Sequence, residues 1–443
     1  MKARILIGAA SSGSGKTTFT LGLLRALKKR GISVQPYKCG PDYIDTQYHK
    51  AACGTDSVNL DTFMGGQAHV KELFAKYGAS SQVDVIEGVM GLFDGYSRME
   101  GSSASIAQLL DVPVLLVVNA KSCAYSVAPV IYGYKNFYKG IKIAGVVFNM
   151  VGSEHHFNIL KDACADLDVP VLGYIPKNRE IEISSRHLGL SLDSEYLVDG
   201  FIEGVASVVE KNVDIDALLK IFTPHSGSLC EGSTTESCNP GGNSSEPAVG
   251  KATANLKIAV AKDEAFNFIY RENIHSLEKL GEVKFFSPLK DTQLPECDLL
   301  YLPGGYPELY LEQLQGNGAM RKAIKEYIEK SGRCWAECGG MMYLCNSISD
   351  ENGNEFEMCG VLGQKATMVG KRLQMGYRQF QYAGKELRGH EFHYSKVEST
   401  LQSVAQQYNA TGKEVATPLY RYKNLIAGYT HLYFGNMNLL ELF

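Results

Sequence analysis

The most constraining stretch of the chain is a glycine-rich segment close to its start. It follows the apolar run Ile5-Leu6-Ile7, opens a helical pattern and contains Gly15-Lys16-Thr17. Glycines in such a loop let backbone N–H groups converge on phosphate oxygens, the lysine reaches the β- and γ-phosphates, and the next hydroxyl can bind Mg²⁺. Ala10 stands where the usual pattern has its first glycine. The segment predicts a nucleotide phosphate-binding loop with these ligand residues: Gly13, Ser14, Gly15, Lys16, Thr17 and Thr18.

Length and composition narrow the class of protein. A chain of 443 residues is too long for one ordinary core, so we expect two domains. The formal net charge of −4 provides no basic stripe for nucleic acid, and the apolar runs are too short to span a membrane, so neither partner is expected. The start of the chain shows no signal-peptide pattern, and the 11 cysteines show no paired metal-binding spacing. We therefore expect reduced thiols and a cytoplasmic location.

The first half alternates apolar strands with segments long enough for helices. Because the strands are apolar throughout, the pattern predicts an α/β fold with a parallel sheet buried on both faces. The expected strands after the loop are 32–38, 83–86, 112–118, 141–148 and 169–175.

Acidic and glycine-rich segments follow these strands. Ligands of parallel sheets collect at the carboxyl ends of the strands, so residues just past them are candidates for binding. Asp42 and Asp45 follow the second strand, and Glu87 directly follows the third. Carboxylates facing a phosphate loop can hold Mg²⁺ between phosphate oxygens, as phosphoryl transfer requires. The sequence predicts a metal site made of Thr17, Glu87, Asp42 and Asp45, although each acid alone could be a solvated turn residue.

A second domain follows a change in composition. Residues 224–255 are rich in Ser, Gly, Thr, Pro and Glu, which is typical of a flexible linker. Strand and helix patterns return afterwards. We therefore expect domains at 1–223 and 256–443, both of the α/β class.

Cys338 lies in the most distinctive motif of this second domain. A short strand, a sharp turn at Cys338 and a helix opening with Gly339-Gly340 predict a nucleophile elbow, in which N–H groups stabilise a thiolate and an oxyanion. The turn Gly304-Gly305 could supply a second donor, so Gly305 and Gly339 are the predicted oxyanion residues. Cys334 and Cys345 have no such setting.

A thiol nucleophile needs a base close in space. The chain has 10 histidines. His431 follows a strand-like apolar run late in the chain and is the preferred candidate; His390 and His393 are its rivals.

These motifs together make the chain resemble the cobyrinate a,c-diamide synthases over nearly its whole length. The resemblance implies a dethiobiotin-synthetase-like P-loop ligase fused to a class I glutamine amidotransferase with a flavodoxin-like α/β fold. It also implies ATP-dependent amidation of the a and c acetates of a corrinoid in cobalamin biosynthesis, with nitrogen from L-glutamine. The segments that carry it are Ser11–Thr18, Lys38–Asp45, Glu87–Gly95, Arg186–Leu190, Gly304–Glu308, Ala336–Gly340, Gly389–Ser395 and Thr430–Phe434.

The resemblance also implies roles for individual residues. Cys338 would form a glutamyl thioester and His431 would raise its nucleophilicity, while Lys16 and Thr17 would hold ATP and Mg²⁺. Many amidotransferases complete a triad with His-x-Glu, but the residue two after His431 is Tyr433, so no third member is visible.

Several alternatives remain open at this point. Related enzymes acting on nickel-sirohydrochlorin or hydrogenobyrinate, and cobyric acid synthase, share the scaffold, and a homodimer is one candidate assembly. A partition-type regulatory ATPase is an alternative of another class, but it carries a signature lysine where this chain has Ser11.

Overall fold

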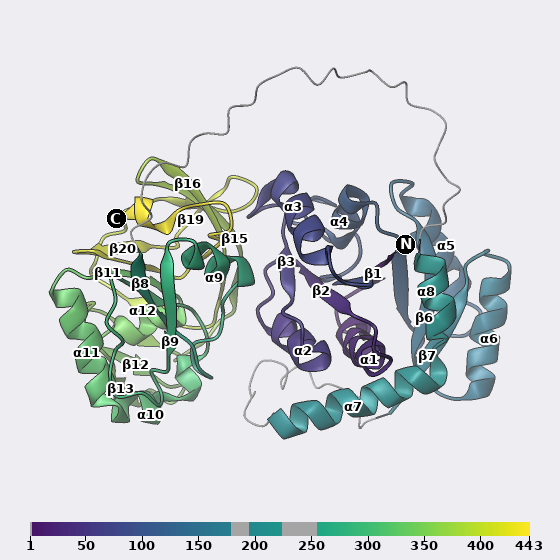
Figure 1. Ribbon diagram of the computed structural model, residues 1–443, viewed down its shortest axis with the longest axis horizontal. Helices are drawn as coiled ribbons and strands as arrows, with labels where there is room; N and C mark the ends of the chain where they lie inside the picture. Colours follow the sequence, from purple (N-terminus) through teal and green to yellow (C-terminus); the bar gives the residue numbers. More distant parts are fainter. Residues whose placement is uncertain (1, 179–194, 224–254) are drawn as a thin grey trace, which may run out of the picture.

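The computed structural model describes residues 2–178, 195–223 and 255–443, which form two α/β domains side by side (Figure 1). Apart from its last residue, the predicted linker 224–255 lies outside the described residues, as does the segment 186–190. The last helix of the first domain ends at Phe222, and the first strand of the second domain begins at Leu256.

The first domain is a doubly wound sheet. Its seven strands are all parallel, in the order β3-β2-β4-β1-β5-β6-β7. The predicted strands are present with ends shifted by a few residues, and the short strand β3 was not predicted. The elements are β1 Ala3–Ala9, α1 Lys16–Lys29, β2 Val34–Cys39, α2 Ile44–Cys53, β3 Val58–Leu60, α3 Gly66–Gly78, β4 Val83–Glu87, α4 Ser103–Leu110, β5 Val114–Asn119, α5 Val127–Phe137, β6 Ile143–Val151, α6 Glu154–Ala165, β7 Val171–Pro176, α7 Glu195–Asn212 and α8 Ile215–Phe222.

Helices cover both faces of this sheet, as the apolar strands require. On one face α1, α2, α7 and α8 pack in one core with the side chains of Phe19, Leu23 and Leu218. On the other face α3 to α6 pack in a second core with Val70, Ile106 and Leu160, among others. In the observed order β4 lies between β2 and β1, so the carboxyl ends of these three parallel strands lie side by side.

The second domain is built on a six-stranded sheet in the order β20-β21-β11-β10-β8-β9, parallel except for β20. Two smaller sheets, β13-β12-β14-β17 and β19-β18-β15-β16-β22, were not predicted. The elements are β8 Leu256–Ala261, α9 Arg271–Glu278, β9 Gly281–Phe286, β10 Leu299–Leu302, η2 Pro307–Leu309, α10 Leu311–Gly316, α11 Gly318–Glu329, β11 Arg333–Glu337, α12 Gly339–Leu344, β12 Ser347–Ser349, β13 Glu355–Glu357, β14 Lys365–Thr367, β15 Gln374–Tyr382, β16 Lys385–His393, β17 Lys396–Glu398, β18 Gln407–Tyr408, β19 Glu414–Val415, β20 Leu419–Tyr422, β21 Leu425–Gly428, β22 His431–Leu432 and η3 Leu439–Leu442.

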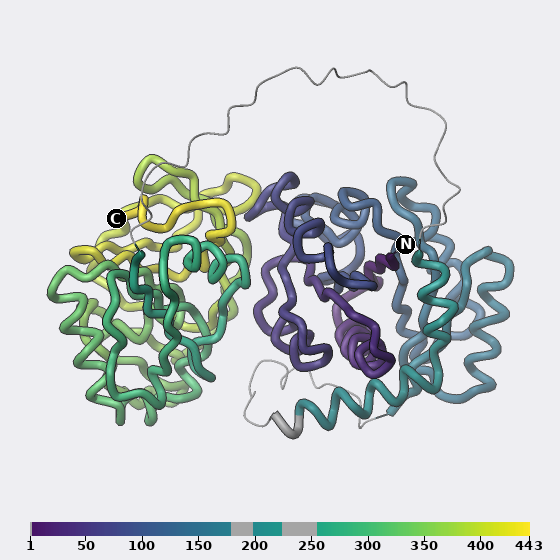
Figure 2. Tube along the Cα trace, in the orientation of Figure 1, coloured from purple at the N-terminus to yellow at the C-terminus, as the bar shows by residue number. Residues whose placement is uncertain are grey.

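The interface between the domains is aromatic at its centre and hydrogen-bonded around it. Figure 2 shows that the purple and blue part of the trace, which includes α2, β3 and α3, faces the second domain. The hydroxyls of Tyr43 and Tyr270 are 2.6 Å apart, and the Tyr377 hydroxyl donates to Asp61 Oδ2 at 2.7 Å. Arg388 donates to the carbonyl of Phe63 at 3.0 Å. Buried aromatic area and satisfied polar groups together hold two active-site candidates against each other.

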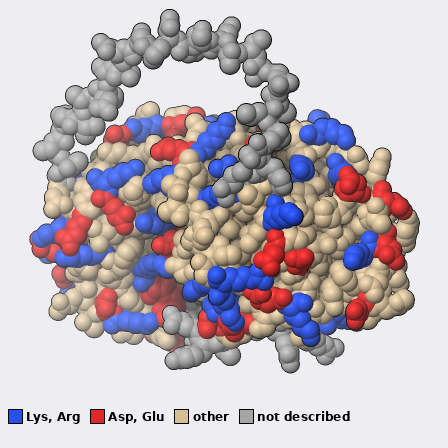
Figure 3. Space-filling view, turned by 45° about the vertical axis from the view of Figure 1, so that its right-hand side comes forward, with Lys and Arg blue, Asp and Glu red and all other residues tan. Residues whose placement is uncertain are grey.

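The outer surface carries interspersed charges. On the face in Figure 3, lysines and arginines alternate with aspartates and glutamates across both domains. No helix among the described residues is long and apolar enough to cross a membrane.

Candidate functional site

The predicted phosphate-binding loop connects β1 to α1. Gly15 precedes the helix with a φ of 98°, and a Cβ there would lie 2.0 Å from the side-chain nitrogen of Asn149. Asn149, at the end of β6, donates that nitrogen to the carbonyl of Ser14 at 2.9 Å. Only glycine therefore fits this turn, and a neighbouring strand holds the loop in place.

Lys16 points back over the loop. Its ammonium donates to the carbonyls of Ser11 at 3.2 Å and Met90 at 2.5 Å. Burial, together with the positive charge of Lys38, lowers the pKa of Lys16 to about 8. A lysine with few charged partners and this position in the loop suits contact with an anionic phosphate.

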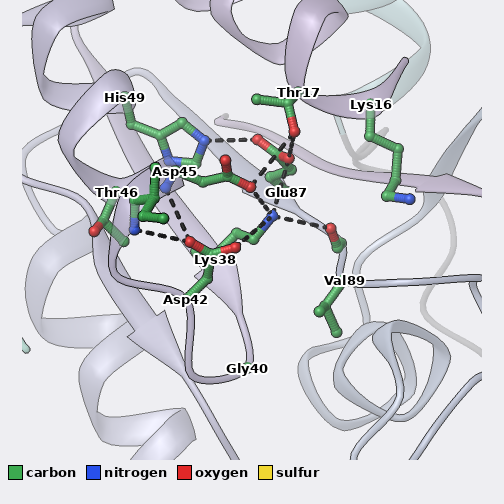
Figure 4. Close-up of polar contacts among 12 residues, drawn as sticks. Lys16, Thr17, Lys38, Gly40, Asp42, Asp45, Thr46, His49, Glu87 and Val89 are labelled. Carbon is green, nitrogen blue, oxygen red and sulfur yellow. Dashed lines mark hydrogen bonds and ion pairs between the residues drawn. The ribbon is translucent and has the colours of Figure 1, made fainter. Parts of the chain in front are cut away.

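Three predicted metal ligands meet around one buried lysine (Figure 4). The Thr17 hydroxyl donates to Glu87 Oε1 at 2.6 Å and lies 3.4 Å from Asp45 Oδ2. The Lys38 ammonium donates to Glu87 Oε1 at 3.0 Å and also to Asp45. His49 Nε2 donates to Glu87 Oε2 at 2.7 Å. Lys38 and His49 were not among the predicted site residues. Their signal in the sequence is that Lys38 precedes Asp42 by four residues and His49 follows Asp45 by four.

Asp42 stands slightly apart from this cluster. Its Oδ1 accepts from the backbone N–H groups of Ile44 and Asp45, both at 2.9 Å, and so begins α2. Its other oxygen lies 3.8 Å from the Lys38 nitrogen. Asp42 therefore shapes the loop that presents Asp45, with one oxygen left facing the cluster.

The charged side chains of this cluster shift one another's pKa values. Burial alone would raise the pKa of Glu87, but the Lys38 charge and hydrogen bonds from His49 and Thr17 hold that pKa well below its usual range. Burial and the neighbouring Asp42 instead raise the pKa of Asp45. Lys38 stays protonated because Asp45 and Glu87 raise its pKa against the effect of burial. The cluster thus pairs one ammonium with one firmly ionised carboxylate.

The donor set fits Mg²⁺ in its chemistry. Thr17, Glu87 and Asp45 supply hard oxygen atoms beside the phosphate-binding loop, which Mg²⁺ prefers. No group of three or more Asp, Glu, His or Cys side chains in the described ranges forms a metal cage on its own. This is the pattern of an ion that takes its remaining ligands from phosphate oxygens and water.

Cys338 occupies a strained turn between β11 and α12. Its φ of 45° and ψ of −106° lie outside the regions that non-glycine residues favour. A Cβ on Gly340 would lie 2.2 Å from the carbonyl oxygen of Leu302, so the helix can pack this closely only with glycine there. Burial, reinforced by Glu308, raises the pKa of the Cys338 thiol well above its usual range. The group is therefore a neutral thiol and not the standing thiolate that its place before a helix suggested.

The second glycine turn lies beside the first. A Cβ on Gly339 would lie 3.1 Å from the backbone nitrogen of Gly305, so the two predicted oxyanion donors are neighbours. Gly305 itself cannot carry a side chain, since its Cβ would lie 2.0 Å from the carbonyl oxygen of Ala265.

His431 lies beside the Gly304 turn and Glu337. A Cβ on Gly304 would lie 2.1 Å from its Cε1, and its Nδ1 lies 3.9 Å from Oε2 of Glu337, the residue before Cys338. The ring is fully buried, and burial lowers its pKa to about 3, with His390 and His393 adding to the effect. The imidazole is thus neutral, and its burial opposes protonation unless a negative group lies close by.

Of the two rival histidines, only His393 has both ring nitrogens hydrogen-bonded among the described residues, whereas Nδ1 of His390 has no partner there. Both ring nitrogens of His393 have partners, Glu391 Oε1 at 2.6 Å and the carbonyl of Ser395 at 2.9 Å. His390 is the cross-strand neighbour of His431 in β16, and burial lowers its pKa to about 4. His393 therefore belongs to a buried ion-pair network, whereas His431 faces the Gly304 turn.

Both domains match known protein families. Residues 5–190 match the CobQ/CobB/MinD/ParA nucleotide binding domain, and residues 257–439 match the CobB/CobQ-like glutamine amidotransferase domain.

Three curated proteins, each named cobyrinate a,c-diamide synthase, are similar over nearly the whole chain. The protein of Listeria innocua is 40% identical over 97% of this chain and 96% of its own length. The protein of Caldanaerobacter subterraneus subsp. tengcongensis is 40% identical over 96% of this chain and 94% of its own length. That of Picrophilus torridus is 39% identical over 97% and 95%.

Proposed function

The chain belongs to the cobyrinate a,c-diamide synthase family, and we propose that it amidates the a and c acetate carboxylates of cobyrinate with ATP and L-glutamine in cobalamin biosynthesis. It is a ligase with a nucleotide-binding domain and a glutamine amidotransferase domain, not a regulatory ATPase. The observation that carries the proposal is the contact between two chemically different sites. One is a phosphate-binding loop with an acidic cluster, and the other is a strained cysteine turn with a buried histidine.

The ligase step begins with a carboxylate, which is a poor acyl donor. Transfer of the γ-phosphoryl group breaks its bond to ADP and forms a P–O bond to a substrate carboxylate oxygen. The resulting acyl phosphate loses inorganic phosphate when ammonia attacks its carbonyl carbon. Lys16 contacts the transferring phosphoryl group, and the Gly13–Thr18 loop orients the nucleotide.

Mg²⁺ would be held by Thr17, Glu87 and Asp45, with Asp42 facing the same cluster. When bound, it neutralises charge on the phosphate oxygens. Lys38 already bridges Glu87 and Asp45, so it keeps the two carboxylates from repelling each other. Binding of a cation there favours loss of any proton on Asp45, because metal ligands bind deprotonated.

The glutaminase step uses the second domain. Sγ of Cys338 attacks the side-chain amide carbon of glutamine while His431 takes the thiol proton. The N–H groups of Gly305 and Gly339 stabilise the oxyanion. The proton passes to the leaving nitrogen, the C–N bond breaks, and ammonia departs from a glutamyl thioester that water then hydrolyses.

Contact between the domains serves the transfer of ammonia. In bulk water at neutral pH ammonia is mostly protonated and then has no lone pair for attack. We infer that the buried aromatic interface around Tyr43 and Tyr270 shields the ammonia from bulk water.

The test is amidation by the purified full-length chain with ATP, Mg²⁺ and glutamine, followed by mass spectrometry. Cobyrinate, hydrogenobyrinate and nickel-sirohydrochlorin are supplied separately, with Lys16→Ala as the matched inactive control. We expect two amidations of cobyrinate and none with Lys16→Ala. Two amidations of only another macrocycle, or amidation at other side chains, would contradict the proposed substrate. Full activity of Lys16→Ala would contradict the proposed nucleotide site.

A further inference from the structure

The carboxylate of Glu337 is buried directly beside His431. Its Oε1 accepts from the backbone N–H of Leu432 at 2.9 Å and from Trp335 Nε1 at 2.8 Å. Its Oε2 accepts from the Tyr301 hydroxyl at 2.8 Å and lies 3.9 Å from Nδ1 of His431. One oxygen therefore fixes the backbone next to the histidine, and the other faces its ring.

The ring of His431 has few other polar neighbours. Within the described part of the chain neither of its nitrogens has a hydrogen-bond partner, although the side chain is fully buried. Aromatic rings of Tyr43 and Phe268 pack against it at centroid distances of 5.1 and 5.8 Å. A buried imidazole that must become positively charged during a reaction needs a negative group close by. Burial raises the pKa of Glu337 to about 7, so this carboxyl, 3.9 Å from the ring, supplies that charge in its ionised form.

We propose that Glu337 is the positioning residue of a Cys338–His431–Glu337 triad, in which its Oε2, 3.9 Å from Nδ1 of His431, orients the ring by charge. This inference rests on the proposed glutaminase function. The orientation leaves Nε2 to take the thiol proton as Sγ bonds to the amide carbon, and the carboxylate stabilises the imidazolium without itself being protonated.

The sequence position of this acid explains why motif comparison does not find it. Tyr433 stands where many amidotransferases have the triad glutamate. Glu337 instead comes from β11, one residue before the nucleophile, and it reaches β22 through the side of the sheet that holds Trp335 and Tyr301. The nucleophile and the acid are therefore fixed by the same strand.

Glu337→Gln tests whether the negative charge of Glu337 acts on His431, because it changes the shape of the side chain very little. The amide oxygen can accept from Leu432 and Trp335, and the amide nitrogen can donate to the Tyr301 oxygen after that hydroxyl rotates. The negative charge beside Nδ1 of His431 is lost, and the Tyr301 hydroxyl loses its acceptor, a change that Tyr301→Phe tests separately. We expect kcat of glutamine hydrolysis to fall about a hundredfold or more with KM nearly unchanged, as for orienting carboxylates elsewhere. Amidation driven by ammonium chloride should be retained.

Tyr301→Phe is the matched control, because it removes another hydrogen bond to the same Oε2 but keeps the charge. It should retain most of the glutamine-dependent kcat. Unchanged kcat in Glu337→Gln would overturn the triad. So would a parallel loss of glutamine-dependent activity, ammonia-dependent activity and melting temperature, since that pattern indicates a structural role. If Cys338→Ser hydrolyses glutamine as fast as the natural chain, the proposed glutaminase function is wrong. The triad inference is then wrong as well.

Discussion

The ring of Tyr43 in the first domain packs at a centroid distance of 5.1 Å from the ring of His431 in the second. Tyr43 lies in the loop between β2 and α2, directly between Asp42 and the helix that carries Asp45. A single side chain thus touches the histidine of one candidate site and belongs to the acidic segment of the other. Movement of this loop on binding of nucleotide or metal would shift the Tyr43 ring against the ring of His431.

The contact predicts that Tyr43 couples the two reactions. Tyr43→Ala removes the ring and should lower the ratio of amide formed to glutamine hydrolysed. Tyr43→Phe keeps the ring and loses only the hydroxyl contact with Tyr270, so it should keep most of that ratio. The ratio is measured from product and glutamate formed in one assay. Equal ratios in the natural chain and both variants would show that the ring has no coupling role.

Glu87→Gln should selectively impair the ligase reaction. The change removes a firmly ionised carboxylate from Lys38 and Thr17, so more Mg²⁺ should be needed for half-maximal ATP-dependent amidation. Loss of one partner of a buried ion pair costs about 3–5 kcal/mol, so melting temperature must be measured beside activity. Glutamine hydrolysis in the second domain should persist. If added Mg²⁺ has no effect and both activities fall with the melting temperature, Glu87 is structural.

Gly304→Ala should displace His431. A methyl group at this position would lie 2.1 Å from Cε1 of the ring, far inside van der Waals contact. We expect glutamine-dependent amidation to fall at least about tenfold, since a small misplacement of a catalytic group has effects of this size or larger. Gly363→Ala is the control, because a Cβ there meets no atom within 4 Å. Similar glutamine-dependent rates in the two variants would place the working histidine elsewhere.

The buried histidines predict weaker folding of the second domain in acid. Burial, together with Arg378, lowers the pKa of His390 to about 4, while Glu391 and Asp42 act in the opposite direction. Below the ordinary histidine pKa of about 6.5 the unfolded chain therefore binds a proton that the folded chain does not. Stability should fall as the pH drops from about 6.5 to about 4, by up to about 1.4 kcal/mol per pH unit for this group.

His390→Gln isolates that contribution. The only tryptophan, Trp335, is buried in the second domain and reports its unfolding in urea by fluorescence. The difference in unfolding free energy between the natural chain and the variant should change across pH 6.5 to 4.5, with the variant less sensitive to acid. Parallel pH dependences would mean that His390 is protonated equally in both states.

Local sequence patterns predicted the parts of the site that depend on short segments. The loop around Lys16 and the turn at Cys338 each combine a strand, glycines and a helix within about a dozen residues, so periodicity and glycine positions suffice. The position of Asp45 and Glu87 after two strands predicted that they lie at the same edge of the sheet, because the carboxyl ends of parallel strands share that edge.

Contacts between distant segments were not predictable in the same way. Lys38 is part of a strand that reads as apolar, and its bonds to Asp45 and Glu87 depend on the strand order. The small sheets containing β15 and β16 lack a strong alternating pattern and are defined by tertiary pairing. The interface at Tyr377 and Asp61 joins residues more than 300 positions apart, for which one sequence carries no signal.

We propose a division of labour in which the second domain produces ammonia and the first domain consumes it. Cys338→Ser tests it most directly, with cobyrinate amidation measured side by side on glutamine and on ammonium chloride. The claim predicts loss of the glutamine-driven reaction, while the ammonia-driven rate stays close to that of the natural chain because the ligase site is intact. A folded Cys338→Ser chain that has lost both reactions, or that keeps the glutamine-driven one, would contradict this division of labour.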